Sequence, residues 1–419
     1  MSTALSPSSV AVVQATAGVV AAHALEITLC FYERMLSADP AVQRFFNKSH
    51  QVSGKQPSAL ADAVVQYALH IDKLDAIAPL VDQIAHRHCA LSVLPEHYGV
   101  VHKHLMAAVA QVLGPAVTPE VGAAWSEAVL HLAGVCIAAE ERLYKQAERR
   151  VGGWRLEREF AVVSCADIAE DTKLVRFKAA DGYAGVFEYE PGQYITLRIG
   201  ETGQAPRHYC LTRPPLLDDF LEIAVRRVPG GVYSNYVHDR LREGDRVLLG
   251  APHGSFGAPK DPQAAVALVG AGIGVASMRA LLHALGPRRV KAGLMVDTTR
   301  GRAVFRDEML ATGAPLRWLA TREGVARGRP DLRLEARRLV DLAGVDAHYL
   351  LCGPVPFMRD MKAALAALGA TRASTNVYGT GTLATAEAAE TEVAAAARSR
   401  RAPHALPHGT PATATCPFA

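Results

Sequence analysis

The first third of the chain has the hydrophobic pattern of a helical domain. From about Pro7 to Tyr144, apolar residues recur every three or four positions, with few β-branched runs. Ser6-Pro7 has the composition of a helix start, because a hydroxyl can cap free amides and proline suits the first helical position. Breaks are predicted at Asp39-Pro40, Gly54, Gly114-Pro115 and Thr118-Pro119. Residues 1–150 are therefore expected to form an all-α domain of a size to enclose one large cofactor.

The pattern changes at Val151–Trp154. Within Tyr194–Ile199 every second residue is apolar, which is typical of a strand with one buried face. Turn signals follow at Pro191-Gly192 and at Pro229–Gly231. We expect residues 151–259 to form an antiparallel β-barrel domain.

A third pattern, alternating strands and helices, begins near Pro262. Ala265–Val269 predicts a buried strand, Gly270–Gly274 a turn and Val275–Leu285 a helix. Further predicted elements are Lys291–Val296, His348–Cys352 and Val355–Leu368. Such alternation favours a parallel sheet with helices on both faces, an α/β domain over residues 260–381. The Ala-, Thr- and Pro-rich residues 382–419 are expected to be a mostly disordered tail.

Composition narrows the class of protein. A chain of 419 residues is expected to form two to three domains. The net charge of +4 is small and dispersed, which argues against nucleic acid and membrane surfaces as partners. The seven cysteines include no CxxC pair, which disfavours a disulfide framework, a zinc site or an iron–sulfur cluster. With no secretory signal visible, and an apolar run at Ala264–Met278 too short to span a bilayer, we expect a soluble, cytoplasmic protein.

The stretch Ile77–Tyr98 carries a candidate metal ligand. Ile77, Leu80, Val81, Ile84 and Ala85 define one apolar helical face, and His88 falls on it, whereas His86 and Arg87 point away. A neutral imidazole in an apolar helical wall can be an axial ligand of haem iron. The alternative is a hydrogen-bonded core histidine.

Two other residues bear on that choice. Tyr98 opens the next helix and Glu140 lies on a later one. A phenol and a carboxylate next to the ring nitrogen opposite the metal would fix the tautomer of His88 and make it a stronger donor.

Glycine-rich turns in the third domain indicate a nucleotide site. Glycines at the end of a buried strand let the backbone approach a pyrophosphate, and the next helix supplies amide donors. Gly270–Gly274 fits this role, and Leu351–Pro354 follows a second buried strand at the same sheet edge. A simple tight strand–helix turn would have the same composition.

The β domain has candidate phosphate and ring contacts. Arg207 could clamp a phosphate, Tyr209 could lie against a flat ring, and Gly230–Ser234 offers further donors. Each of these features by itself would also fit a strand with a surface arginine or a hairpin turn.

In order, the motifs RxYx, GGxxS, GxGxG and CGP make the chain resemble the flavohaemoglobins, in which a globin is fused to a ferredoxin-reductase-like FAD and NAD(P)H module. The similarity covers about residues 1–380. It implies haem b, FAD and NAD(P)H as cofactors. It also implies nitric oxide dioxygenation, in which NAD(P)H-derived electrons reach the haem through FAD and O2 and NO become nitrate. We expect small-molecule partners only, no nucleic acid, no membrane insertion, and a monomer.

The resemblance also assigns residues. His88 is the implied haem ligand, with Tyr98 and Glu140 as its hydrogen-bonding pair. The implied distal residues are Tyr32 and Gln56, with Phe46, Leu60 and Arg87 as further haem or flavin contacts. Implied FAD contacts are Tyr194, Arg207, His208, Tyr209, Cys210, Ser234, Val377, Tyr378, Gly379 and Thr380. Implied nicotinamide-nucleotide contacts are Ala271, Gly272, Ile273, Gly274, Val275, Ala276, Cys352, Gly353 and Pro354.

Other interpretations stay open at this point. Tyr32 could be a core tyrosine, Gln56 a surface residue, and Glu140 half of an exposed ion pair with Arg142 or Lys145. The whole chain could be a haem-based O2 or NO sensor, or a haem–flavin reductase acting on a lactate or a lipid hydroperoxide.

Some residues depart from the family pattern. Cys210 stands where the family has serine, and Asn376 stands where it has a carboxylate beside the flavin. The first should slow hydride transfer to FAD, and the second should raise the flavin potential. The choice between NADH and NADPH is open, since Arg300 and Arg302 could meet a 2′-phosphate or be ordinary surface arginines.

Overall fold

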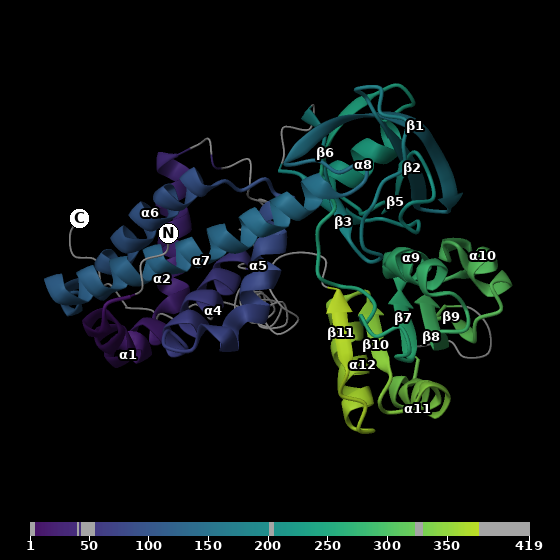
Figure 1. The fold of residues 1–419 in the computed structure, drawn as a ribbon. Coiled ribbons are helices and arrows are strands. Elements are labelled where there is room, and N and C mark those ends of the chain that lie inside the picture. Colours follow the sequence, from purple (N-terminus) through teal and green to yellow (C-terminus); the bar gives the residue numbers. More distant parts are fainter. Residues whose placement is uncertain (1–4, 40–41, 43–54, 201–204, 323–329, 377–419) are drawn as a thin grey trace, which may run out of the picture.

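Three units follow one another along the chain in the computed structural model (Figure 1). It describes residues 5–39, 42, 55–200, 205–322 and 330–376. The order is helices, then an antiparallel sheet, then a parallel sheet with helices on both faces, so the predicted fold class is confirmed.

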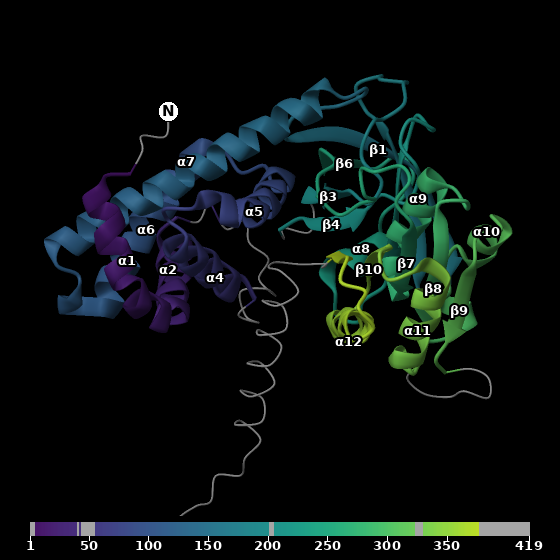
Figure 2. The same ribbon diagram turned by 60° about the horizontal axis from the view of Figure 1, so that its bottom comes forward.

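The helical unit is built around a long C-terminal helix. Its helices are α1 (Pro7–Ala22), α2 (Ala24–Ala38), α4 (Lys55–Leu69), α5 (Ala78–Ala90), α6 (Pro95–Leu113) and α7 (Pro119–Arg149). The predicted start at Ser6-Pro7 is confirmed, because Ser6 Oγ accepts a bond from the Ser9 amide at 3.2 Å. Helix α7 runs along the unit and ends beside the β unit (Figures 1 and 2).

Helix α7 is long and apolar enough to cross a membrane by length and composition, and α1 and α2 would pass the same test as one bent pair. Core helices of globular domains satisfy this criterion as well. In α7, Trp125, Ala128 and Leu143 are buried in the hydrophobic core of the helical unit. These three residues give the helix a packing role in that core.

The second unit is a six-stranded barrel. Its strands are β1 (Glu157–Ala169), β2 (Thr172–Ala179), β3 (Tyr194–Arg198), β4 (Arg207–Cys210), β5 (Leu221–Arg226) and β6 (Arg246–Gly250), with the helix α8 (Val232–Asp239). Their order is β4-β3-β6-β1-β2-β5, and every pairing is antiparallel. A bridge between Leu211 and Ile223 joins the two ends and closes the barrel, as predicted.

The outer face of β3 is covered by the helical unit. Ile195 and Leu197 fill the barrel core, but Thr196 between them is also buried. The reason lies at Gly250, where an added Cβ would come within 3.1 Å of both the Ala90 carbonyl oxygen and Thr196. The end of α5 therefore packs against the barrel next to β3 and β6.

The third unit is a doubly wound sheet. Its strands are β7 (Val266–Ala271), β8 (Val290–Asp297), β9 (Leu316–Ala320), β10 (His348–Cys352) and β11 (Ala373–Asn376). Its helices are α9 (Val275–Leu285), α10 (Arg306–Ala311), α11 (Leu332–Ala343) and α12 (Val355–Ala366). The strand order is β11-β10-β7-β8-β9, all parallel. Successive residues of β7 pack toward opposite sides, Ala267 with α11 and α12 and Leu268 with α9.

Candidate functional site

A histidine, a tyrosine and a carboxylate from three helices meet in the helical unit. His88 on α5 has its Nδ1 2.8 Å from Glu140 Oε1 on α7 and 2.9 Å from Tyr98 Oη on α6. The Tyr98 hydroxyl donates to the same carboxylate oxygen. A carboxylate acceptor places the proton on Nδ1, so the lone pair of His88 lies on Nε2.

Burial keeps the tyrosine of this network protonated. Glu140 is 2% exposed. Burial, and then the neighbouring Cys136 and Glu140, raise the pKa of Tyr98, so its hydroxyl stays a donor. The interpretation of Glu140 as an exposed ion pair is wrong, because Lys145 lies 3.5 Å from Glu141 instead.

The surface around His88 fits a large flat apolar group. Val81 and Ala85 are buried, as predicted. Leu80 and Ile84 were expected to be buried too, but they lie half-exposed on the edge of the same face as His88. The His88 side chain is itself 35% exposed. An imidazole with an open Nε2 in a half-exposed apolar wall is the donor set that haem iron takes.

The residues that the resemblance assigns to the distal side of the haem are described in part. Tyr32 on α2 is 8% exposed, and burial raises its pKa. Leu60 on α4 packs against the core of the helical unit. Gln56 lies within α4, but its side chain, like the whole of Phe46, lies outside the described residues.

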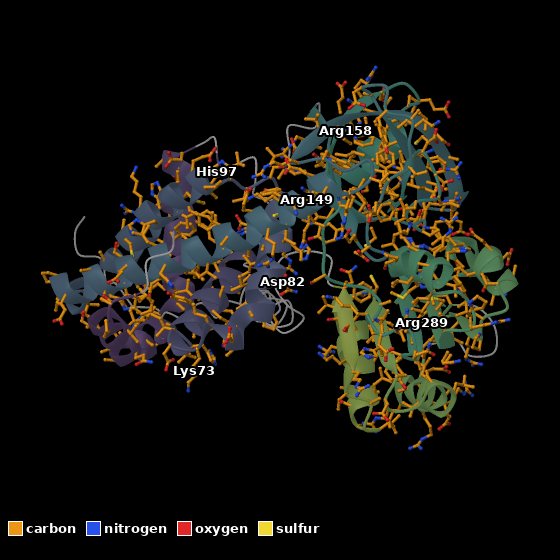
Figure 3. The ribbon with its side chains drawn as sticks, viewed as in Figure 1. Lys73, Asp82, His97, Arg149, Arg158 and Arg289 are labelled. Atoms are coloured by element: carbon orange, nitrogen blue, oxygen red, sulfur yellow. The ribbon has the colours of Figure 1, made fainter. Side chains whose placement is uncertain are left out.

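A cavity lies where the three units meet. The space between protein atoms in the cavity and at its mouth is about 720 Å³, part of it open to solvent. Its lining includes four residues predicted as cofactor contacts, namely Arg87, Tyr194, His208 and Cys210. Asp82 on α5 and Arg149 at the end of α7 lie on the side of the helical unit that faces the other two units (Figure 3). Helix α5, the barrel sheet and the parallel sheet each contribute residues to the lining of the cavity.

The walls of the cavity suit a flat aromatic ring. Tyr194 and His208 stack on neighbouring strands with ring centroids 4.9 Å apart and an interplanar angle of 15°. Burial raises the pKa of Tyr194 to about 12, and Arg87 acts in the opposite direction. Burial lowers the pKa of Arg87, which Tyr194 partly offsets. Arg87 thus brings a half-buried positive charge to this wall.

The two departures from the family pattern touch each other in this cavity. Asn376 Nδ2 lies 3.5 Å from Cys210 Sγ, and both residues are buried. On the other side, Cys352 Sγ lies 3.8 Å from the Asn376 carbonyl oxygen. Asn376 therefore meets one thiol through its side-chain amide and another through its main-chain carbonyl oxygen.

The two glycine-containing loops meet at one edge of the parallel sheet. A Cβ on Gly274 would lie 2.2 Å from the Cys352 carbonyl oxygen, and one on Gly353 would lie 2.9 Å from Ala271. Only glycine permits this backbone contact. The neighbours Ile273, Val275 and Ala276 continue into α9, and Pro354 caps α12. The predicted nucleotide residues are thus brought together.

The predicted phosphate contacts also adjoin one another. The Arg207 guanidinium lies 5.1 Å from the centre of the Tyr233 ring, next to Ser234. Arg207 also donates to the Pro206 carbonyl oxygen, and Ser234 Oγ accepts from the Val228 amide at 3.0 Å. Tyr209 is half-buried, and burial raises its pKa. Val377, Tyr378, Gly379 and Thr380 lie outside the described residues.

One of the two arginines considered for a 2′-phosphate has partners within the protein. Arg302 is paired with Asp171 and donates to Thr298 Oγ1 at 3.3 Å. The side chain of Arg300 lies outside the described residues.

Sequence reasoning missed two histidines at the junction of the units. His86 accepts a bond from the Gly254 amide in the barrel unit, and the ring of His253 lies 6.1 Å from it. His86 was expected only to point away from the apolar face, which says nothing about what it meets. A contact across 168 positions has no periodic signal in the sequence.

Comparisons with known proteins agree with this architecture. Residues 29–136 match the globin family, and residues 159–257 match the oxidoreductase FAD-binding domain family. The flavohemoprotein of Bordetella parapertussis is 37% identical over 402 residues, which cover 91% of this chain and all of that protein. Flavohemoprotein A of Dictyostelium discoideum is 34% identical, covering 87% of this chain and 95% of that one.

A solved structure extends the likeness to the whole fold. The crystal structure of flavohemoglobin from Malassezia yamatoensis, with bound FAD and heme, has a TM-score of 0.78 at 26% identity. It covers 90% of this chain and all of that one. Fold and site together define a globin joined to an FAD-binding oxidoreductase module. The chain belongs to the flavohemoprotein family.

Proposed function

We propose that this chain is a nitric oxide dioxygenase that uses electrons from NAD(P)H, passed through FAD to haem b, to convert NO and O2 into nitrate. Haem and flavin supply the one-electron chemistry when bound. Family membership over 91% of the chain supports this function, as does the name nitric oxide dioxygenase carried by a Vibrio cholerae relative. The observation that carries it is the hydrogen-bonded network of His88, Tyr98 and Glu140.

The residues of the helical unit have distinct roles in this proposal. His88 would hold iron through Nε2, while Glu140 keeps the proton on Nδ1 and so makes the imidazole a stronger donor. Electron donation of this kind favours oxygen chemistry over reversible carriage. On the opposite side, the protonated hydroxyl of Tyr32 and the amide of Gln56 would donate hydrogen bonds to a partly negative ligand.

The reductase residues would bind and orient the two nucleotides. Tyr194 and His208 offer stacked rings at the cavity wall, and Arg207 and Ser234 would meet the FAD phosphates. The loops around Gly274 and Gly353 would receive NAD(P)H. We propose residues 1–150, 151–259 and 260–381 as the haem, flavin and nucleotide domains.

NO consumption under air tests the function. Purified holoprotein with NADH should consume NO rapidly and form nitrate, and NADH oxidation should rise sharply when NO is added. A sensor would bind NO without this turnover. A reductase of another substrate would oxidise NADH at a rate indifferent to NO.

The haem ligand is tested by its absorption band. His88→Ala should abolish the haem Soret band and keep the flavin absorbance, and His102→Ala on α6 is the matched control. A haem band that survives in His88→Ala would refute the assignment. That the protein acts as a monomer in the cytoplasm stays a prediction, for sedimentation and cell fractionation to test.

A further inference from the structure

A hydrogen bond ties helix α5 to the cavity where the three units meet. The Gly254 amide, in the loop after β6, donates to His86 Nδ1 at 3.0 Å. Gly254 has a φ of +121°, and a Cβ there would lie 2.9 Å from the Tyr194 ring. The loop backbone is therefore held between α5 and a wall of the cavity. His86 precedes His88 by two residues on the same helix.

His253 lies immediately behind this contact. Its backbone pairs in both directions with Tyr194, at 3.0 and 2.9 Å. Its ring packs edge-on against Tyr144 of α7, with centroids 6.2 Å apart and an angle of 85°. The ring is almost completely buried, and its Nε2 has no hydrogen-bond partner among the described residues. The ring thus contributes packing rather than a bond from that nitrogen.

Both rings are neutral in this arrangement. An Nδ1 that accepts from Gly254 places the proton of His86 on Nε2, which lies 3.7 Å from Asp82 Oδ2. Burial, with His86, Arg150 and His208 nearby, lowers the pKa of His253 to about 3. A neutral pair can stay buried between two units without a counter-ion.

We propose that His86 and His253 are positioning residues that hold α5 against the loop at Gly254 and thereby set the rate of electron transfer from flavin to haem. The inference rests on the proposed function. Electron tunnelling falls steeply with distance, so a small shift of α5 relative to the cavity would slow this step and leave the other steps intact. His86 acts through its acceptor nitrogen, whereas His253 acts through the volume of its ring.

Anaerobic stopped-flow on the holoprotein separates the steps. NADH reduces the flavin, seen as bleaching of its absorbance, and the haem band reports the next transfer. His86→Leu should slow haem reduction about tenfold and leave flavin reduction within about twofold. His86→Gln should restore the rate, because its amide oxygen can accept from Gly254. The control is His102→Leu, whose hydrogen bond to Ser126, 2.8 Å long, lies inside the helical unit.

The role of His253 is tested by a variant that keeps the volume of the ring and lacks its nitrogens. His253→Ala should slow haem reduction, and His253→Phe should keep it near the wild-type rate because the ring volume is retained. If Phe fails like Ala, the unpaired nitrogen matters and the volume argument is wrong.

Hydrogen exchange of the full-length protein provides a readout that does not depend on turnover. The Gly254 amide should exchange about tenfold faster in His86→Leu than in wild type or His86→Gln. Unchanged exchange and an unchanged haem-reduction rate in His86→Leu would overturn the inference. Wild-type protein whose haem is never reduced by NADH would instead defeat the proposed function. Should His86→Leu not fold, the comparison of His253→Phe with His253→Ala decides.

Discussion

The barrel unit is joined to its two neighbours by interfaces of opposite chemistry. Toward the helices, the rings that meet, those of His86, His253 and Tyr144, are neutral, and the charge of Arg87 lies beside them at the cavity. Toward the parallel-sheet unit, the buried contact is charged: Glu222 of β5 lies 2.7 Å from Arg279 of α9, and both are buried. A second charged pair, Arg226 with Asp297, crosses the same boundary at 3.0 Å.

The difference concerns what each interface loses when one of its residues is replaced. Removing one partner of a buried ion pair leaves the other ion buried without its counter-charge, whereas removing a neutral ring leaves only a cavity or an unmade contact. Single substitutions in the charged interface should therefore cost more stability than substitutions of the neutral rings.

The largest expected effect comes from breaking the charged interface. Arg279→Leu should lower the free energy of unfolding of the reductase half by about 3 kcal/mol, because buried Glu222 loses one of its two arginine partners and keeps only Arg176 and Thr212. Denaturant unfolding followed by flavin release measures this loss.

The matched control is an arginine in an exposed pair. Arg306 lies 2.8 Å from Asp307 on the surface, and Arg306→Leu should cost less than about 1 kcal/mol. Equal losses from the two variants would show that the buried pair has no special weight.

Acid should open the two interfaces in different pH ranges. The pKa of His253 is about 3 in the folded protein against an ordinary 6.5, so the unfolded state binds more protons between these values. The stability of the neutral contact therefore falls as pH drops from 6.5 toward 3, by up to about 1.4 kcal/mol per unit.

Glu222 behaves differently. Burial raises its pKa, but hydrogen bonds from Thr212 and Arg176 and the charge of Arg279 outweigh this and lower it below the ordinary 4.5. Its stabilisation is present above pH 4.5 and is lost only as pH falls through the lowered value. Hydrogen exchange at pH 5.5 should thus accelerate around Gly254 and not around Arg279. His253→Phe should abolish the acceleration around Gly254 at pH 5.5. Acceleration around both Gly254 and Arg279 at that pH would contradict the comparison.

Sequence reasoning succeeded where the signal is local. The start of α1 at Ser6-Pro7, the helix Val275–Leu285 and the strand His348–Cys352 follow from caps, glycines and apolar runs. The amphipathic α11 and the short edge strand β9 were not predicted, because one is rich in charged residues and the other has only five residues.

The same distinction between local and long-range signals applies to the residues of the candidate site. His88, Tyr98 and Glu140 were named from family spacing, and the structure brings them into contact. The bond between Gly254 and His86 and the pair of Glu222 with Arg279 join residues 168 and 57 positions apart. Nothing in the periodicity of either segment specifies its partner, since tertiary packing alone creates these contacts.

A smaller effect is expected at the part of the interface between the barrel and the parallel-sheet unit that lies at the cavity, where the contact is neutral. At the cavity, the contact between barrel and parallel-sheet unit is Asn376 with Cys210, and neither carries a charge. Asn376→Glu should place a carboxylate beside the reduced flavin and lower its midpoint potential, on the order of tens of millivolts. A redox titration measures the shift, with Ser374→Glu, at an exposed position of β11, as control. An unmoved potential in Asn376→Glu would refute the electrostatic role of this position.

The smallest effect should come from the partner thiol. Cys210→Ser replaces a weak hydrogen-bond donor by a stronger one at the cavity wall, so hydride transfer from NADH to flavin should speed up a few-fold. Because Asn376 Nδ2 lies 3.5 Å from Cys210 Sγ, the amide bonds to whichever atom replaces the sulfur. The effects of Cys210→Ser and Asn376→Glu on flavin reduction should therefore not add, differing from additivity by about 0.5 kcal/mol or more. If the two effects on the rate of flavin reduction add, the two residues act on the flavin separately, and the contact between them has no role in that step.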